Sequence, residues 1–296
     1  MAPWAGDAMA LSCALAWAIS VLLLRRLSAQ NPVALNLFKN SLAALLHSLT
    51  LFATGGQFAS DRSLEDWLLL CASGVLGLAL ADTLFLAGLR RIDASVAAVT
   101  DCVYSPTVVV LSFLFLGEAL GVGLLIGGPL VLLGLLVVVL PIGRKRRLEP
   151  ALVDRKGVAL ALAGVLMTAV AVIICKPVLN RSSLIEATAV RLWAGSVALF
   201  GFEASFGRAK SALALFRPQA AWRQALPAAL MGTYVAMLLW LGGIKYGTAS
   251  RAALLNQMGA IFVLVLSALV LGERPPFLRW LGAGIAVVGV ALIVSL

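Results

Sequence analysis

The chain has 296 residues, of which 62% are hydrophobic and 12% are charged, and its mean hydropathy is +1.04. This composition excludes a soluble globular domain and is that of an integral membrane protein, with the lipid bilayer as its surroundings. The formal charge of +10 comes from short loops between apolar runs rather than from one basic patch, which argues against nucleic acid as a partner.

Ten apolar runs are each long enough to cross a hydrocarbon core of about 30 Å as a helix. We expect these transmembrane helices at residues 8–24, 33–53, 67–89, 94–116, 119–140, 157–179, 184–202, 226–244, 249–271 and 276–296. The charged segment 144–156 is a linker that no span could contain, so it divides the chain into a first unit, 1–143, and a second unit, 157–296. The sequence therefore predicts an all-α integral membrane protein with ten transmembrane helices.

The two units contain the same stretch of sequence. Residues 97–118 read AAVTDCVYSPTVVVLSFLFLGE and residues 252–273 read AALLNQMGAIFVLVLSALVLGE, with identical residues at ten positions that lie 155 apart. An internal duplication is the simplest explanation. Because each unit holds five helices, an odd number, the second must enter the membrane upside down relative to the first. Inverted repeats of this kind enclose a substrate site near the midplane in many secondary transporters.

Further marks accompany the duplication: Leu-Gly-Glu ends both copies, a helix with two glycines seven positions apart follows each, and a basic residue lies inside the second helix of each unit, at Lys39 and Arg191. Together with Trp17, Pro32 and the Ala-Ser step at 94–95 and 249–250, this pattern resembles the EamA-type branch of the drug/metabolite transporter superfamily over nearly the whole chain. The resemblance implies a ten-helix bundle around a central cavity. It also implies export of amino acids or other small metabolites without ATP, from the cell's inner (plasma) membrane.

Three charged residues of the first unit share one level of the membrane. Asp82, Asp101 and Lys39 each lie roughly 6–7 Å from the middle of a span, and all are displaced toward the same face. One carboxylate can pair with Lys39 as a structural salt bridge, which leaves the other in excess. An excess carboxylate can carry a coupling proton or bind a substrate amine. We expect Asp101, more than Asp82, to have that role.

In the second unit, Arg191, Asn256 and Met237 take the places of these three residues, near the opposite face. The cavity should therefore be acidic at one end and basic at the other. Arg191 has two possible roles, since its guanidinium can bind a substrate carboxylate bidentately or can pair with Glu186 as a structural anchor.

Polar side chains also share one face of the 94–116 helix, where Asp101, Tyr104 and Ser105 are spaced i, i+3 and i+4. We interpret this face as cavity lining rather than a helix contact. Three aromatic residues are further candidates for substrate contact, with plain core packing as the alternative: Trp17, Tyr234 and Trp240.

Other residues in the spans are interpreted as structural. Lys176 lies near its helix end and should snorkel to the interface, and His47 should be held by a hydrogen bond. Glu118 and Glu273 open apolar helices, whose N-terminal dipoles favour a carboxylate. The glycine-spaced helices 119–140 and 276–296 suit close packing or a dimer contact, so the chain is expected as a monomer or a homodimer. The four cysteines have no metal-ligand spacing, and neither a metal nor another cofactor is expected.

These features favour a secondary transporter, with a small-molecule substrate and possibly the proton as coupling ion. A multidrug transporter or one for nucleosides or choline-like compounds is the first alternative. A membrane-embedded enzyme would require paired histidines or a nucleophile motif, and a scaffold or receptor would require a large extramembrane region.

The membrane orientation has two opposed indications. Sixteen basic residues in odd-numbered loops against four in even-numbered loops place both termini outside the cytoplasm, whereas the resemblance places them inside.

Overall fold

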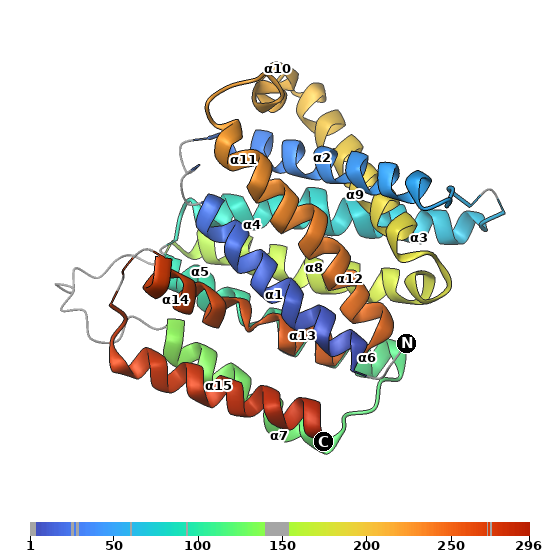
Figure 1. The fold of residues 1–296 in the computed structure, drawn as a ribbon. Coiled ribbons are helices and arrows are strands. Elements are labelled where there is room, and N and C mark those ends of the chain that lie inside the picture. Colours follow the sequence, from blue (N-terminus) through green and yellow to red (C-terminus); the bar gives the residue numbers. More distant parts are fainter. Residues whose placement is uncertain are drawn as a thin grey trace.

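The computed structural model describes residues 4–24, 27, 30–59, 61–92, 94–139, 154–270, 272 and 274–296, and all regular structure in them is helical (Figure 1). The α-helices are α1 (Ala5–Leu24), α2 (Pro32–Ala53), α3 (Leu64–Gly74), α4 (Asp82–Leu89), α5 (Ala94–Asp101), α6 (Tyr104–Leu116), α7 (Val122–Val139), α8 (Arg155–Arg181), α9 (Leu184–Ser205), α10 (Ala209–Ala212), α11 (Trp222–Ala229), α12 (Ala236–Tyr246), α13 (Ala249–Asn256), α14 (Gly259–Val270) and α15 (Phe277–Ser295). Two π-helical segments, η2 (Val75–Ala81) and η4 (Leu230–Val235), connect α3 to α4 and α11 to α12. The charged linker predicted at 144–156 lies outside the described residues except for its last three positions.

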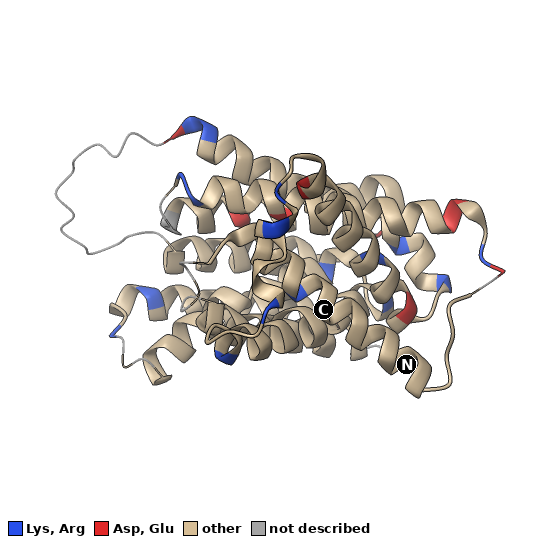
Figure 2. Cartoon of the chain, turned by 90° about the horizontal axis from the view of Figure 1, so that it is seen from above, with Lys and Arg blue, Asp and Glu red and all other residues tan. Residues whose placement is uncertain are grey.

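Nine helical segments in the described parts of the chain are long and apolar enough to cross a membrane. The tenth predicted span corresponds to α2, which has 22 residues and packs against α9 inside the bundle. Its apolar character is diluted by Asn36, Lys39 and Asn40. Charged residues occupy only short parts of the ribbon in Figure 2. The predicted class, an all-helical membrane protein built from two five-helix units, is confirmed.

The two repeats interrupt their helices at equivalent points. The π-helical segments start at Val75 and at Leu230, which are 155 positions apart. The fourth span breaks after Asp101 and the ninth after Asn256, again 155 positions apart. Local departures from α-helical geometry free backbone groups and are common at functional sites. The duplication seen in the sequence therefore extends to the irregular parts of the fold.

Glycine determines where the duplicated stretch ends. Gly117 has φ +64° and ends α6, and Gly272 has φ +66° at the equivalent position of the second repeat. A left-handed backbone conformation strains any residue with a Cβ atom, so the Leu-Gly-Glu motif needs glycine at its centre.

Helices α7 and α15 pack against each other along one edge of the bundle (Figure 1). Their backbones meet at two glycine pairs: a Cβ atom on Gly282 would lie 2.7 Å from the carbonyl oxygen of Gly134, and one on Gly289 would lie 2.7 Å from that of Gly127. Rising numbers in one helix meet falling numbers in the other, so the two helices are antiparallel. This is the arrangement that inverted repeats require, and the close packing predicted for these two helices is confirmed.

Candidate functional site

Lys39 of α2 and Asp82 of α4 form an ion pair, with 3.3 Å between Nζ and Oδ2. Both side chains are partly buried, at 18% and 32% exposure. Asp82 directly follows η2, whose wider turns lead into α4 at this level of the bundle. Of the two carboxylates that the sequence offered as partners of Lys39, the structure uses Asp82.

Asp101, the other of these two carboxylates, has no salt bridge among the described residues. It is the last residue of α5, and its backbone oxygen accepts a hydrogen bond of 3.2 Å from Nε2 of Gln257, which lies at the equivalent break of the second repeat. The side chain is exposed. A carboxylate at the C-terminal end of a helix also faces the negative end of the helix dipole, which favours a proton or a cation beside it.

Arg191 of α9 is the largest fully buried side chain, at 1% exposure. Its Nη1 donates to the sulfur of Cys175 at 3.0 Å, while Nε and Nη2 have no hydrogen-bond partner among the described residues. The alternative anchor, Glu186, is engaged elsewhere, since it forms an ion pair of 3.0 Å with Arg62 and accepts a hydrogen bond from the backbone of Ala59. Arg191 is therefore a buried cation without a carboxylate partner in the described structure.

Several spans converge on Arg191. The Trp240 ring lies 5.7 Å from its guanidinium carbon, a cation–π distance, and a Cβ atom on Gly77 of η2 would lie 3.6 Å from Nη2. Tyr104 is buried, its hydroxyl has no hydrogen-bond partner among the described residues, and its side chain belongs to the hydrophobic core cluster against which Trp240 packs. The structure thus places Arg191, Trp240 and Tyr104, three of the residues selected from the sequence, in one part of the core, and Asp101 precedes Tyr104 by three positions in the same span.

The remaining predicted residues are placed differently. Ser105 is fully buried and donates to the backbone oxygen of Ala253 at 3.3 Å, so it links α6 to α13. Tyr234 bonds Thr50 at 2.6 Å and packs edge-on against His47. Two further predicted residues complete the set: Trp17 of α1 is 43% exposed, and Asn256, at the end of α13, has its Oδ1 buried without a donor in the described part of the chain.

Comparison with known proteins gives the class to which this arrangement belongs. The model of the EamA-like transporter family matches twice, at residues 4–140 and 155–295. The chain belongs to the EamA-like transporter family. One solved structure, described only as "Crystal structure of protein", is similar with a TM-score of 0.79 and 16% identity, over 97% of this chain and 95% of that chain, which supports the fold. No curated protein matches the sequence.

In the described part of the chain, four ion pairs join the two repeats of this EamA-like transporter at one end of the bundle, where α1, α3, α9 and α13 begin; we call it the ion-paired end. The pairs are Asp7–Arg251 (2.6 Å), Asp66–Arg181, Arg62–Glu186 (3.0 Å) and Glu118–Lys176 (2.8 Å). Each joins a residue of the first repeat to one of the second. Sequence reasoning missed these pairs, because the partners lie 58 to 244 positions apart and no local spacing connects them.

Lys176 and Glu118 both differ from the sequence prediction. Lys176 does not snorkel but is buried, and it donates to Glu118 and to the backbone oxygens of Ile244 and Gly247. Glu118 accepts hydrogen bonds from the backbone nitrogens of Ala249 and Ser250 at 2.7 and 3.0 Å. It therefore caps α13 of the other repeat rather than the helix that follows it. Its repeat equivalent, Glu273, lies outside the described residues.

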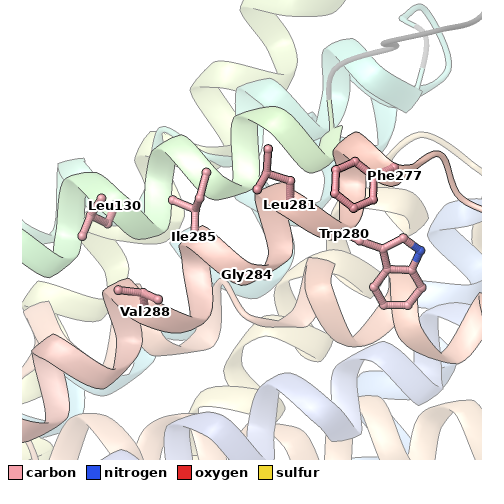
Figure 3. Close-up of a pocket in the computed structure, with 7 residues that line it drawn as sticks. All are labelled: Leu130, Phe277, Trp280, Leu281, Gly284, Ile285 and Val288. Carbon is pink, nitrogen blue, oxygen red and sulfur yellow. The ribbon is translucent and has the colours of Figure 1, made fainter.

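Two pockets lie away from the Arg191 cluster. A groove of about 470 Å³ between α7 and α15 is lined by apolar residues and glycine, several of them well exposed, so it faces outward from the bundle (Figure 3). Its residues are Leu130, Phe277, Trp280, Leu281, Gly284, Ile285 and Val288. A second pocket of about 450 Å³ lies at the ion-paired end beside Glu118 and Lys176. The side chains that line the first carry no charge, and their polar group is the indole N–H of Trp280.

Proposed function

We propose that this protein is a secondary active transporter that exports small zwitterionic metabolites, such as amino acids, across the cell's inner membrane. One observation supports this most directly: Arg191 is a buried cation and Asp101 is a carboxylate inside a span, and neither has an ion-pair partner among the described residues. An ionisable group inside a bilayer costs about 2.5–3.5 kcal/mol on insertion scales, so such groups mark substrate or ion sites. A zwitterion supplies both missing partners, a carboxylate for Arg191 and an ammonium group for Asp101.

Coupling to a proton gradient follows from the same arrangement. Lys39 neutralises Asp82 at 3.3 Å, which leaves Asp101 as the carboxylate available for a proton. Substrate and proton would then compete for, or share, one acidic group, that of Asp101. Alternating access requires the inverted repeats to separate at one end while they close at the other. At the ion-paired end, separation means breaking pairs such as Glu118–Lys176.

A choline-like cation is the alternative that the cluster favours less. Such a substrate would use Asp101 and the aromatic ring of Trp240, but it would leave Arg191 without a counterion. A nucleoside would leave both charges unmatched. The Arg191 guanidinium thus favours substrates that carry an acidic group.

Uptake into proteoliposomes tests the proposal with a labelled panel of amino acids, choline and nucleosides, with and without a proton gradient. We expect gradient-dependent accumulation of amino acids. Arg191→Lys keeps the charge but loses the fork geometry, so it should lower the rate by about tenfold or more at unchanged folded yield. Accumulation of choline or nucleosides in place of amino acids rejects the substrate class. A collapse of the folded yield in Arg191→Lys identifies the residue as a structural anchor.

A further inference from the structure

The two repeats place a basic residue at the same position of the same helix. Lys39 is the eighth residue of α2 and Arg191 is the eighth residue of α9, and both helices have 22 residues. Asp82 and Met237 are likewise equivalent, since each lies seven positions after the start of its π-helical segment. The ion pair of the first repeat therefore has a counterpart in the second, in which a methionine stands where the carboxylate should be.

Met237 does not replace the missing charge. It is partly buried and packs against an apolar cluster that contains Leu78 and Leu192. Among the described residues, the Arg191 guanidinium contacts the Cys175 thiol and the Trp240 ring but no carboxylate, and the side chain is 1% exposed. Burying a charge away from water without a partner is strongly unfavourable. The unpaired Arg191 guanidinium therefore lowers the stability of the fold.

The free edge of Arg191 has the geometry that carboxylates bind. Its Nη1 is engaged by Cys175, and the two nitrogens without a partner among the described residues, Nε and Nη2, form the other edge of the guanidinium. The same chain uses that edge twice for carboxylates: Arg251 donates from Nε and Nη2 to both oxygens of Asp7, and Arg181 donates from the same two nitrogens to Asp66. A planar, two-oxygen anion therefore matches the open edge of Arg191.

We propose that Arg191 is a carboxylate-binding site which Met237 keeps vacant, and that the substrate's carboxylate takes the place that Asp82 occupies in the first repeat. This proposal rests on the proposed function in one respect, that the bound carboxylate belongs to the transported molecule. Met237 is then a specificity-determining residue, because any acidic side chain at that position would occupy Arg191 from within the protein.

Access to the edge involves η2. Gly77 of this π-helical segment lies beside Nη2, and the backbone of Arg191 is in such close contact with Gly74 that no Cβ atom fits there. In the conformation described, the edge is closed to solvent. An anion therefore reaches it when η2 and α9 move apart, a motion that belongs to the exchange between inward-open and outward-open states.

Met237→Asp is the variant that tests the proposal, with Met237→Leu and Met237→Asn as matched controls that add no charge. The measurement is the shift in melting temperature of the purified protein in detergent on addition of acetate, glycine, ethylamine or inorganic phosphate. Acetate and glycine should stabilise the wild type and both controls, and ethylamine should have no such effect. In Met237→Asp the apparent Kd for acetate and glycine should rise by about tenfold or more, because the new carboxylate competes for Arg191.

If Met237→Asp does not fold, Arg191→Met tests the proposal instead. This variant alone should abolish the shift in melting temperature that acetate causes. An acetate shift that survives in Arg191→Met or in Met237→Asp overturns the proposal, and so does an equal or larger shift with phosphate. If acetate and glycine bind through Arg191 but no amino acid is transported, the proposed function fails and the carboxylate site stands. If amino acids are transported with equal efficiency by Met237→Asp, the transport function stands and this site does not.

Discussion

Lys176 and Glu118 form a buried ion pair across the two repeats, with 2.8 Å between Nζ and Oε1 and side-chain exposures of 9% and 8%. The same carboxylate accepts the backbone N–H groups that begin α13. One residue of the first repeat therefore neutralises a cation and caps a helix, both in the second repeat. Breaking a buried pair by removing one partner typically costs about 3–5 kcal/mol.

Glu118→Gln is expected to lower the stability and to flatten its dependence on pH. Burial by itself would raise the pKa of the Glu118 carboxyl, but the hydrogen bonds from Lys176 and from the backbone of Ala249 and Ser250 outweigh it and hold the pKa below its ordinary value of 4.5. A lowered folded-state pKa adds stability above the unfolded-state pKa, and this stability is lost as the pH falls through the folded-state pKa. The wild type should therefore weaken from about pH 5 downward, and Glu118→Gln much less.

Thermal unfolding in detergent between about pH 3 and pH 7 measures both effects. Asp154→Asn is the control, because Asp154 pairs with Arg91 at an exposed site and caps α8, and asparagine keeps the cap. It should change the stability little, because an exposed ion pair is only weakly stabilising. Identical pH profiles for Glu118→Gln and the wild type would contradict the assignment.

Asp101→Asn is expected to fold and insert normally yet lose gradient-driven transport. The equivalent residue of the second repeat is Asn256, so an amide of nearly the same shape already fits this helix environment. If Asp101 carries only the coupling proton, substrate exchange across the membrane should persist in the variant. Counterflow and gradient-driven uptake in proteoliposomes separate the two activities.

Asp82→Asn supplies the comparison, since its loss leaves Lys39 without its partner and should affect stability more than coupling. Gradient-driven transport by Asp101→Asn at the wild-type rate from about pH 5 to pH 8 would remove Asp101 from the mechanism.

Gly282→Ala is expected to loosen the contact between α15 and α7. The added methyl group would lie 2.7 Å from the backbone oxygen of Gly134 and 2.9 Å from the Cβ of Val137, and overpacking of this kind costs about 1–3 kcal/mol. Gly284→Ala, two positions later in the same helix, meets nothing within 4 Å and should be neutral. The melting temperatures of the two variants test this directly. Equal melting temperatures would show that the glycine contact does not determine the stability of the protein.

The membrane orientation is expected to follow the charge count, with both termini outside the cytoplasm. Positive charges in short loops favour the cytoplasmic side, and the odd-numbered loops hold most of them. A single cysteine introduced at Arg146, in a background free of the four native cysteines, should then resist an impermeant thiol reagent in intact cells. Ready labelling would reverse the orientation in favour of the family resemblance.

The repeat offset of 155 positions made much of this fold predictable. It gave the equivalence of Asp101 with Asn256 and, with five apolar runs in each unit, the inverted arrangement, because a duplicated sequence keeps its helix register. Helix geometry put Lys39 at one depth with Asp82 and Asp101, and Asp82 is the partner that the structure shows.

Contacts between the repeats could not be predicted in the same way. Whether Lys176 snorkels or turns inward depends on Glu118, which reaches it only through the packing of α6, α8 and α13. Ser105 was placed on the cavity face by its spacing from Asp101, but the break between α5 and α6 rotates that face toward Ala253. Helical spacing relates residues within one regular helix. Lys176 and Glu118 lie on different segments, and a helix break separates Ser105 from Asp101, so spacing predicted neither contact.

The glycine contacts between α7 and α15 have a consequence for how the chain is assembled. Gly127 meets Gly289 and Gly134 meets Gly282, while Gly282 and Gly289 are themselves the duplicates of Gly127 and Gly134. The contact is therefore isologous, the kind that a single five-helix unit would make with a second copy of itself about a two-fold axis. Because this helix surface is complementary to itself, no second, different surface is needed to bind it. Duplication and fusion of one five-helix unit are therefore enough to form the contact between α7 and α15.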